Sequence, residues 1–512
     1  MYKKLLTNSA TSLLLHISGI VIAFVVSPIF VRTLGNRDYG AWEVVSSIAG
    51  YLGVLDLGIS PAIVCLVARA SAQNDQNRMK KVLSSAIGAL TFVGLVSMTI
   101  MLVLTNYSYQ ILNARQGEIP YLKVLFVLMA ANLLVQFPGT AFVAYLMGLI
   151  QYNFINVLRL ITGIIQAMAS CYLLLTYPHK GLFYLICSLT VFNYFQYIII
   201  GLKVIASSSR GNIHYRHIDG RILKELTRFG LSSMILMAAD RLQRACIPLV
   251  LAHTTGLSQI VFFVIPKGLI EYARGLALAL SQPLMPYYGY LDGKGDLDQT
   301  REKWCDLSKW MQYISLGIAV SVITLGENLL RIWMGAMYAE KGKWILYFLG
   351  ASMLLECIAP NAPRYLIGSG KHGKPARIQL AISIVMLGPI YFCAKYLGIN
   401  GVAAVLFVGT SATTFIFLLM VCKNLQLSFG QHFTKTVVPL IVPGLAVSAV
   451  LLLARIYFPL NSYLSMALAG LVAGAVYLVG GWYYLPTSDE KNAIRRELVA
   501  LLSKLVPERQ KP

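Results

Sequence analysis

The stretch IVFFVIPKGLIEYARGLALALSQPL, residues 260–284, is long and apolar enough to cross a bilayer as a helix. It nevertheless contains Lys267, Glu271 and Arg274 near its middle. At about 100° per residue, these three side chains fall within an arc of about 60° on one face. An unpaired Lys or Arg at mid-membrane costs about 2.5 to 3.5 kcal/mol on insertion scales. We therefore expect this face to line a wet, basic cavity rather than to contact lipid.

The preceding apolar segment, residues 229–250, also carries charged residues, namely Asp240, Arg241 and Arg244. Guanidinium groups bind phosphate oxygens in pairs, and ammonium groups act as point charges, so such a set suits a diphosphate. The predicted diphosphate-binding residues are Arg241, Arg244, Lys267 and Arg274. The alternative is a structural network in which Asp240 pairs with Arg244, and Glu271 pairs with Lys267 and Arg274. Even then, the two segments keep two positive charges.

The composition indicates an integral membrane protein. Hydrophobic residues make up 57% of the 512 residues and charged residues only 12%, whereas soluble domains are about a quarter charged. Apolar runs of about 20 residues predict an all-α polytopic fold with about fourteen transmembrane helices. The eight cysteines are scattered, so the sequence indicates neither a disulfide framework nor a zinc site, and no metal ligand set is expected.

The basic residues show which way the helices run. With a cytoplasmic N-terminus, 28 of the 43 Lys and Arg fall in cytoplasmic segments, 10 in external segments and 5 within spans. The positive-inside rule therefore predicts that both termini are cytoplasmic. This distribution explains most of the net charge of +22 without a nucleic-acid partner.

Two halves of the sequence resemble each other at an offset of about 221 or 222 residues. Gly35 corresponds to Gly256, and Asp75 corresponds to Asp296. Each half has six spans, an even number, so the repeats are expected to run in parallel, with the substrate site between them. The predicted organisation is an N-lobe (1–205), a cytoplasmic linker (206–228), a C-lobe (229–424), two further helices (425–485) and a cytoplasmic tail (486–512). The tail pattern suits either an amphipathic helix on the membrane or a solvated helix.

Acidic residues within the spans have two interpretations. Glu43 and Asp56 lie in the second predicted span, and Glu356 lies one turn before Pro360 in the tenth. With Asp240 and Glu271, they are candidates either for coupling to H⁺ or Na⁺ or for ion pairing within the protein. Asp56 belongs to a Leu-Asp-Leu-Gly sequence followed by Pro61, where a weakened helix would expose backbone carbonyls.

Several short motifs resemble the multidrug, oligosaccharidyl-lipid and polysaccharide (MOP) exporter superfamily, and within it the polysaccharide exporters, or Wzx-type O-antigen and repeat-unit flippases. The motifs are Asn8-Ser9, Pro28, Arg32-Thr33-Leu34-Gly35, Tyr39-Gly40, Leu55-Asp56-Leu57-Gly58, the basic loop at 77–81, Leu223-Lys224-Glu225-Leu226 and Phe229-Gly230-Leu231. The resemblance covers nearly the whole chain. It implies two six-helix lobes in a V that alternate between inward-open and outward-open states, followed by two C-terminal helices.

The resemblance also implies a function. Such proteins translocate polyprenyl diphosphate-linked oligosaccharides, the repeat units of O-antigen, capsule or exopolysaccharide, across the bacterial inner membrane by alternating access. The expected partners are that glycan lipid, membrane lipid and polysaccharide polymerase or assembly proteins; no cofactor is expected. A multidrug antiporter of the same superfamily is an alternative, but its acidic residue on the first helix has no counterpart before Phe30. A membrane polymerase or ligase is less favoured, because every predicted external loop is short. The expected protein is therefore not an enzyme.

Overall fold

The computed structural model describes residues 2–56, 58–113, 122–207, 218–281, 284–371 and 373–485. Within these ranges, it does not describe the side chains of residues 2–13, 16, 54, 72, 207, 229–245, 279–280 and 286. Every regular element among the described residues is helical. The chain divides into two compact units, Met1–Gly268 with His372–Gly409, and Leu269–Lys371 with Thr410–Pro512. The predicted tail helix lies outside the described residues.

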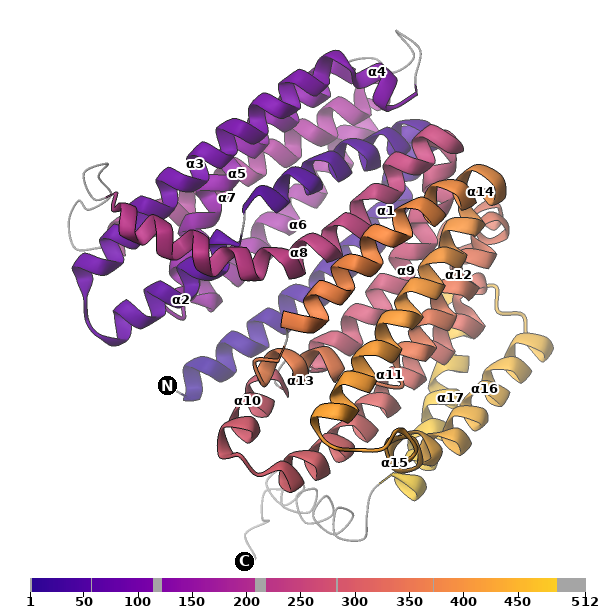
Figure 1. Ribbon diagram of the computed structural model, residues 1–512. Helices are drawn as coiled ribbons and strands as arrows, with labels where there is room; N and C mark the ends of the chain where they lie inside the picture. Colours follow the sequence, from indigo (N-terminus) through magenta and orange to yellow (C-terminus); the bar gives the residue numbers. More distant parts are fainter. Residues whose placement is uncertain are drawn as a thin grey trace, which may run out of the picture. The chain divides into compact units, whose positions relative to one another are not determined.

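The first unit is built mainly from the N-terminal helices. In Figure 1, α3, α5 and α7 run side by side, and α1 packs on α6 and α8. The elements of this unit are α1 (Tyr2–Leu52), the 3₁₀ turn η1 (Gly53–Asp56), α2 (Ile59–Ala72), α3 (Gln76–Asn106), α4 (Ser108–Ile111), α5 (Leu122–Gly148), α6 (Tyr152–Thr176), the 3₁₀ turn η2 (Pro178–Lys180), α7 (Gly181–Ser207) and α8 (Gly220–Thr254).

Two helices belong partly to each unit. They are α9 (Leu257–Ser281), divided after Gly268, and α14 (Gly373–Asn424), divided after Gly409. The second unit contains α10 (Leu284–Lys294), α11 (Leu297–Trp333), α12 (Ala336–Glu356), α13 (Ala362–Gly368), α15 (Phe429–His432), the π-helical turn η4 (Phe433–Val437), α16 (Val438–Tyr457) and α17 (Tyr463–Tyr484).

Nine of the described helical segments are long and apolar enough to cross a membrane. Two very long helices, α1 and α14, each contain a glycine with a positive φ, Gly35 at 76° and Gly398 at 64°. Residues with a side chain rarely adopt these angles, so each glycine allows a sharp bend that separates two helical segments.

Polar caps fix where several helices begin. The Asp75 carboxylate accepts a hydrogen bond from the Arg78 amide at the start of α3, and Asp296 accepts one from the Gln299 amide at the start of α11, both at 2.9 Å. Each cap satisfies an amide that has no partner inside its helix. Ser462 forms a capping box with Ser465 at the start of α17.

The core of the second unit attaches the C-terminal pair, α16 and α17, to α11. A buried cluster includes Val320 on α11, Val447 and Leu451 on α16 and Ala473 on α17. Tyr313 and Tyr477 stack with ring centroids 4.2 Å apart, and each hydroxyl donates to the other residue's carbonyl oxygen at 2.6 Å. The terminal helix pair is therefore part of this unit rather than a loose appendage.

Candidate functional site

Helix α9 holds three of the sequence-predicted site residues. It follows Gly256, whose φ of 89° turns the chain sharply after α8, and it contains Pro266. Lys267, Glu271 and Arg274 are all half-buried. Because the division between the units follows Gly268, Lys267 belongs to the first unit, and the other two belong to the second.

In the second unit, Arg274 is held between two carboxylates. Its Nη1 donates to Glu271 Oε1 and its Nε donates to Glu356 Oε2, both at 2.9 Å. The three side chains are 20%, 29% and 26% exposed, respectively. One positive charge therefore faces two negative charges, and this cluster carries a net charge of −1. Arg274, one of the four cations that the sequence analysis assigned to a diphosphate, is thus compensated within the protein.

In the first unit, Lys267 lies within electrostatic range of Glu43 on α1. Tyr39, one turn before Glu43, is hydrogen-bonded to its carboxylate. Gly40 brings α1 very close to the start of α9, because a Cβ at this position would collide with the Leu257 carbonyl oxygen. The close approach of the two backbones lets the acidic and the basic side chain interact.

Asp56 lies where the helical path of the second predicted span is interrupted. The 3₁₀ turn η1 ends at Asp56, Gly58 has a φ of 70°, and α2 starts at Ile59. The Ser60 hydroxyl donates to Asp56 Oδ1 at 3.2 Å. The break expected from the Leu-Asp-Leu-Gly sequence is present, and the carboxylate is bonded across it.

Arg364 is one of the basic residues that the positive-inside count assigns to a cytoplasmic segment. It lies on α13, half-buried, and its Nε donates to Ser281 Oγ at 3.3 Å. Ser281 is two turns beyond Arg274 on α9, and therefore close to the same face. Within the described parts of the chain, Arg364 has no carboxylate at ion-pair distance. Pro360, which lies between the end of α12 at Glu356 and the start of α13 at Ala362, is the sequence feature that could have indicated this short separate helix.

Packing explains why Arg364 faces α9. Its neighbours Tyr365 and Leu366 are 1% exposed and belong to a core cluster with Tyr288 and Trp304. Gly368 also lets α13 approach α10 so closely that a Cβ would collide with the Met285 carbonyl oxygen. Because these residues fix the buried side of α13, Arg364 is turned toward Ser281.

Three further sequence-predicted site residues lie on the helix that precedes α9. Asp240, Arg241 and Arg244 lie within helix α8, but their side chains are outside the described residues. Among the residues whose side chains are described, no group of His, Cys, Asp and Glu has the arrangement of a metal site.

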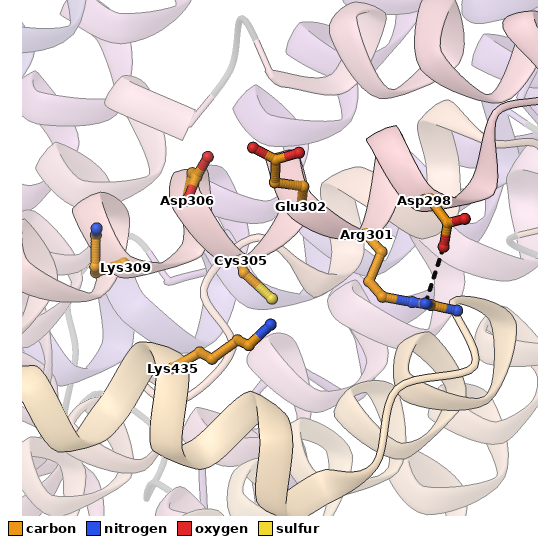
Figure 2. Close-up of a pocket in the computed structure, with 7 residues that line it drawn as sticks. All are labelled: Asp298, Arg301, Glu302, Cys305, Asp306, Lys309 and Lys435. Carbon is orange, nitrogen blue, oxygen red and sulfur yellow. Dashed lines mark hydrogen bonds and ion pairs between the residues drawn. The ribbon is translucent and has the colours of Figure 1, made fainter. Parts of the chain in front are cut away.

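A separate cavity of about 370 Å³ lies between α11 and η4 in the second unit (Figure 2). Its lining contains three acidic residues, three basic residues and one thiol, which are Asp298, Arg301, Glu302, Cys305, Asp306, Lys309 and Lys435. Arg301 is already bonded to Asp298 at 3.0 Å and to the Leu425 carbonyl oxygen at 2.9 Å. Because its charges balance, this cavity does not favour a dianionic ligand.

Apolar membrane-length helices with buried charged residues are typical of a transporter that moves a polar solute across a bilayer. A family profile described as "Polysaccharide biosynthesis protein" matches residues 5–289. The chain belongs to this family, which is part of the MOP superfamily. The family comprises transporters rather than enzymes.

The proteins that this chain resembles in sequence or in fold are named as transporters or flippases. A protein of Shigella flexneri named "Putative O-antigen transporter" is 20% identical over 409 residues, which cover 78% of this chain and 93% of that protein. The lipid II flippase MurJ, in an inward closed conformation, matches with a TM-score of 0.70 and 13% identity, covering 93% of this chain and 98% of that one. An inward-facing MATE multidrug transporter matches with a TM-score of 0.64 and 14% identity, covering 80% and 94%. These likenesses show a multi-pass MOP-transporter fold.

Proposed function

We propose that this protein is a flippase for polyprenyl diphosphate-linked oligosaccharide. The observation that carries the proposal is the polar face of α9, which continues at Ser281 to Arg364, a half-buried cation without a described acidic partner. Such a cation favours an anion with several oxygen atoms, as a diphosphate has. Family membership and the distant O-antigen transporter relative support the same class of substrate.

The proposed topology has fourteen spans with both termini in the cytoplasm of a bacterium, in its inner membrane. Gly35 and Gly398 divide α1 and α14 into two spans each. Helices α8, α9 and α12 are long enough to cross a bilayer, but each carries three or more charged residues. The two divided helices add one span each, and the three charged helices add three, so the nine candidate spans become fourteen.

The proposed lobes, 1–205 and 229–424, are supported by backbone turns that recur at nearly constant spacing. Positive φ angles occur at Gly35 and Gly256, Asn74 and Gly295, Asn113 and Gly335, and Ile150 and Gly370. These pairs are separated by 220 to 222 residues. Because left-handed residues mark sharp turns, the recurrence supports a duplicated helical unit, with 425–485 as an addition.

In the proposed mechanism, the sugar and the diphosphate pass through a polar cavity while the polyprenyl tail stays in lipid. Arg364 adds to the sequence-predicted set Arg241, Arg244, Lys267 and Arg274. We assign Arg274 mainly to positioning, because two carboxylates already neutralise it. With a negative interior, the membrane potential favours outward movement of two negative charges by about 4 to 5 kcal/mol per 100 mV.

The carboxylates could also let a cation reset the empty carrier. The Arg274 cluster has an excess of one negative charge, and Glu43 and Asp56 are half-buried. Proton or sodium coupling through these groups is a secondary part of the proposal. A transport rate that depends on an imposed pH or sodium gradient would support it.

The test uses the native host with this gene deleted. Polyprenyl diphosphate glycans are extracted, their accessibility from each side of the inner membrane is measured, and surface polysaccharide is stained. We expect glycan to accumulate on the cytoplasmic face, and wild type but not Arg364→Gln with Lys267→Gln to restore export. The matched control is Lys123→Gln with Lys395→Gln, which changes the same number of charges at exposed positions. Normal surface polymer in the deletion strain, with increased sensitivity to cationic drugs, would instead favour a multidrug antiporter.

A further inference from the structure

One corner of the second unit concentrates basic side chains where the proposed topology places few. Of the ten basic residues assigned to external segments, four lie here: Arg331, Lys341, Lys343 and Arg455. The acidic residues in the same segments are Glu327 and Glu340. The corner thus has a net charge of +2. External segments are normally poor in Lys and Arg, so this concentration requires an explanation.

Three of these cations converge on one carboxylate, and we call this group the Glu327 cluster. Arg455 Nη2 donates to Glu327 Oε2 at 2.7 Å, Arg331 lies 3.6 Å from Oε1, and Lys343 lies 4.0 Å from Oε2. The residues come from the end of α11, the start of α12 and the end of α16. Glu327 compensates one of the three positive charges, so the cluster keeps a net charge of +2.

The three cations of the Glu327 cluster differ in the number and length of their contacts. Arg455 also donates to the Thr324 carbonyl oxygen at 3.2 Å and to the Tyr347 hydroxyl at 3.4 Å, and its side chain is 28% exposed. Among the described residues, Arg331 and Lys343 make longer contacts to Glu327, and Lys343 also lies 6.0 Å from the centroid of the Tyr347 ring; their side chains are 47% and 42% exposed. Arg455 therefore holds α16 against α11 and α12, whereas Arg331 and Lys343 can bind a further anion.

The surroundings of the cluster match the boundary between lipid tails and headgroups. Trp344 on α12 is 55% exposed, and Tyr457 and Phe458 at the end of α16 are 74% and 66% exposed. Exposed aromatic side chains beside helix ends are typical of membrane interfaces. An anion that meets the cluster from the membrane side is therefore the phosphate of a lipid headgroup.

We propose that the Glu327 cluster binds the headgroup phosphate of an anionic phospholipid, with Arg331 and Lys343 as the contacts and Arg455 as the positioning residue. The acyl chains of this lipid would lie against the apolar exposed residues beside the cluster. This site is separate from the polar face of α9, and it does not depend on which substrate the protein transports.

The test is lipid binding to the detergent-purified, full-length protein by native mass spectrometry. Phosphatidylglycerol is compared with phosphatidylcholine of the same acyl chains, for the wild type, Arg331→Gln with Lys343→Gln, and the control Lys123→Gln with Lys395→Gln. A cation near an anionic lipid contributes about 1 kcal/mol, or about fivefold in affinity. We expect about thirtyfold weaker phosphatidylglycerol binding in the first double variant, and no change in the control.

The proposal is overturned if the wild type binds both lipids equally, or if the two double variants bind phosphatidylglycerol alike. Competition by millimolar inorganic phosphate would assign the site to a free anion and would also overturn it. The double variant keeps Arg455 and should fold. Should its thermal midpoint in phosphatidylcholine differ from wild type, Lys343→Gln alone replaces it, with an expected fivefold loss. Because no transport is measured, these outcomes are independent of the flippase proposal.

Discussion

Arg274 provides the sharpest test of how charge is arranged on α9. Replacing it with Gln removes two charge-assisted hydrogen bonds of 2.9 Å and leaves the carboxylates of Glu271 and Glu356 without their shared cation. Hydrogen bonds to charged groups contribute about 1.5 to 3 kcal/mol each. The three side chains are between 20% and 29% exposed, so we take the lower value. We expect Arg274→Gln to lower the free energy of unfolding by about 3 kcal/mol.

The excess negative charge of the cluster predicts a different result for Glu356. Glu356→Gln leaves a neutral pair of Arg274 and Glu271, and we expect a loss below about 1 kcal/mol. In the Arg274→Gln background, the same substitution removes one of the two carboxylates that have lost their shared cation. We therefore expect it to restore part of the lost stability, with a coupling energy of at least about 1 kcal/mol.

The assay is thermal unfolding of the purified protein in lipid nanodiscs, followed by intrinsic fluorescence. A loss of 3 kcal/mol corresponds to a shift of about 6 to 12 °C for a unit of this size. Lys395→Gln, at an exposed position, serves as the control and should stay within about 0.5 kcal/mol of wild type. Equal losses for Arg274→Gln and Glu356→Gln, or strictly additive effects, would refute the idea that Arg274 serves two carboxylates.

Three further predictions concern the rest of the chain. Tyr477→Phe removes one of two reciprocal 2.6 Å hydrogen bonds with Tyr313 and should lower the stability of α17 by about 1 kcal/mol. Amide hydrogen exchange in α17 should therefore become faster. Unchanged protection from exchange would show that the bond contributes nothing. Gly40→Ala should destabilise the first unit because the added Cβ meets the Leu257 carbonyl oxygen, whereas Gly50→Ala has open space and should not; thermal unfolding compares them. The Arg221 amide and the Lys81 ammonium hold the pKa of Asp219 below its usual range. The stability that Asp219 adds to α8 should therefore be fully present above the pKa of Asp219 in the unfolded chain. It should be lost as the pH falls through the lowered pKa of the folded protein. Exchange of the Arg221 amide measured against pH, with Asp219→Asn as the comparison, checks this, and acid-sensitive exchange that persists in Asp219→Asn would contradict it.

Features that depend on a few neighbouring residues could be predicted from the sequence. The apolar runs predicted a helical membrane protein, the motifs predicted the MOP superfamily, and both conclusions are confirmed. The Leu-Asp-Leu-Gly sequence followed by Pro61 predicted a weakened helix beside Asp56, and the structure has a break there with Gly58 in the left-handed region. Helix ends and turns follow from local backbone preference, so sequence reasoning reaches them.

The charge of the candidate site could not be predicted in this way. Glu271 is close to Arg274 in the sequence, and their pairing was one of the alternatives. Glu356 is 82 residues away, and its carboxylate reaches Arg274 only because α12 packs against α9. Arg364 was counted only as a basic residue of a cytoplasmic segment, and its hydrogen bond to Ser281 depends on how α13 packs. The sequence by itself determined the membrane class, the helices and the positions where they break. Which carboxylate neutralises which cation was decided only by tertiary structure, because that depends on the register in which distant helices pack.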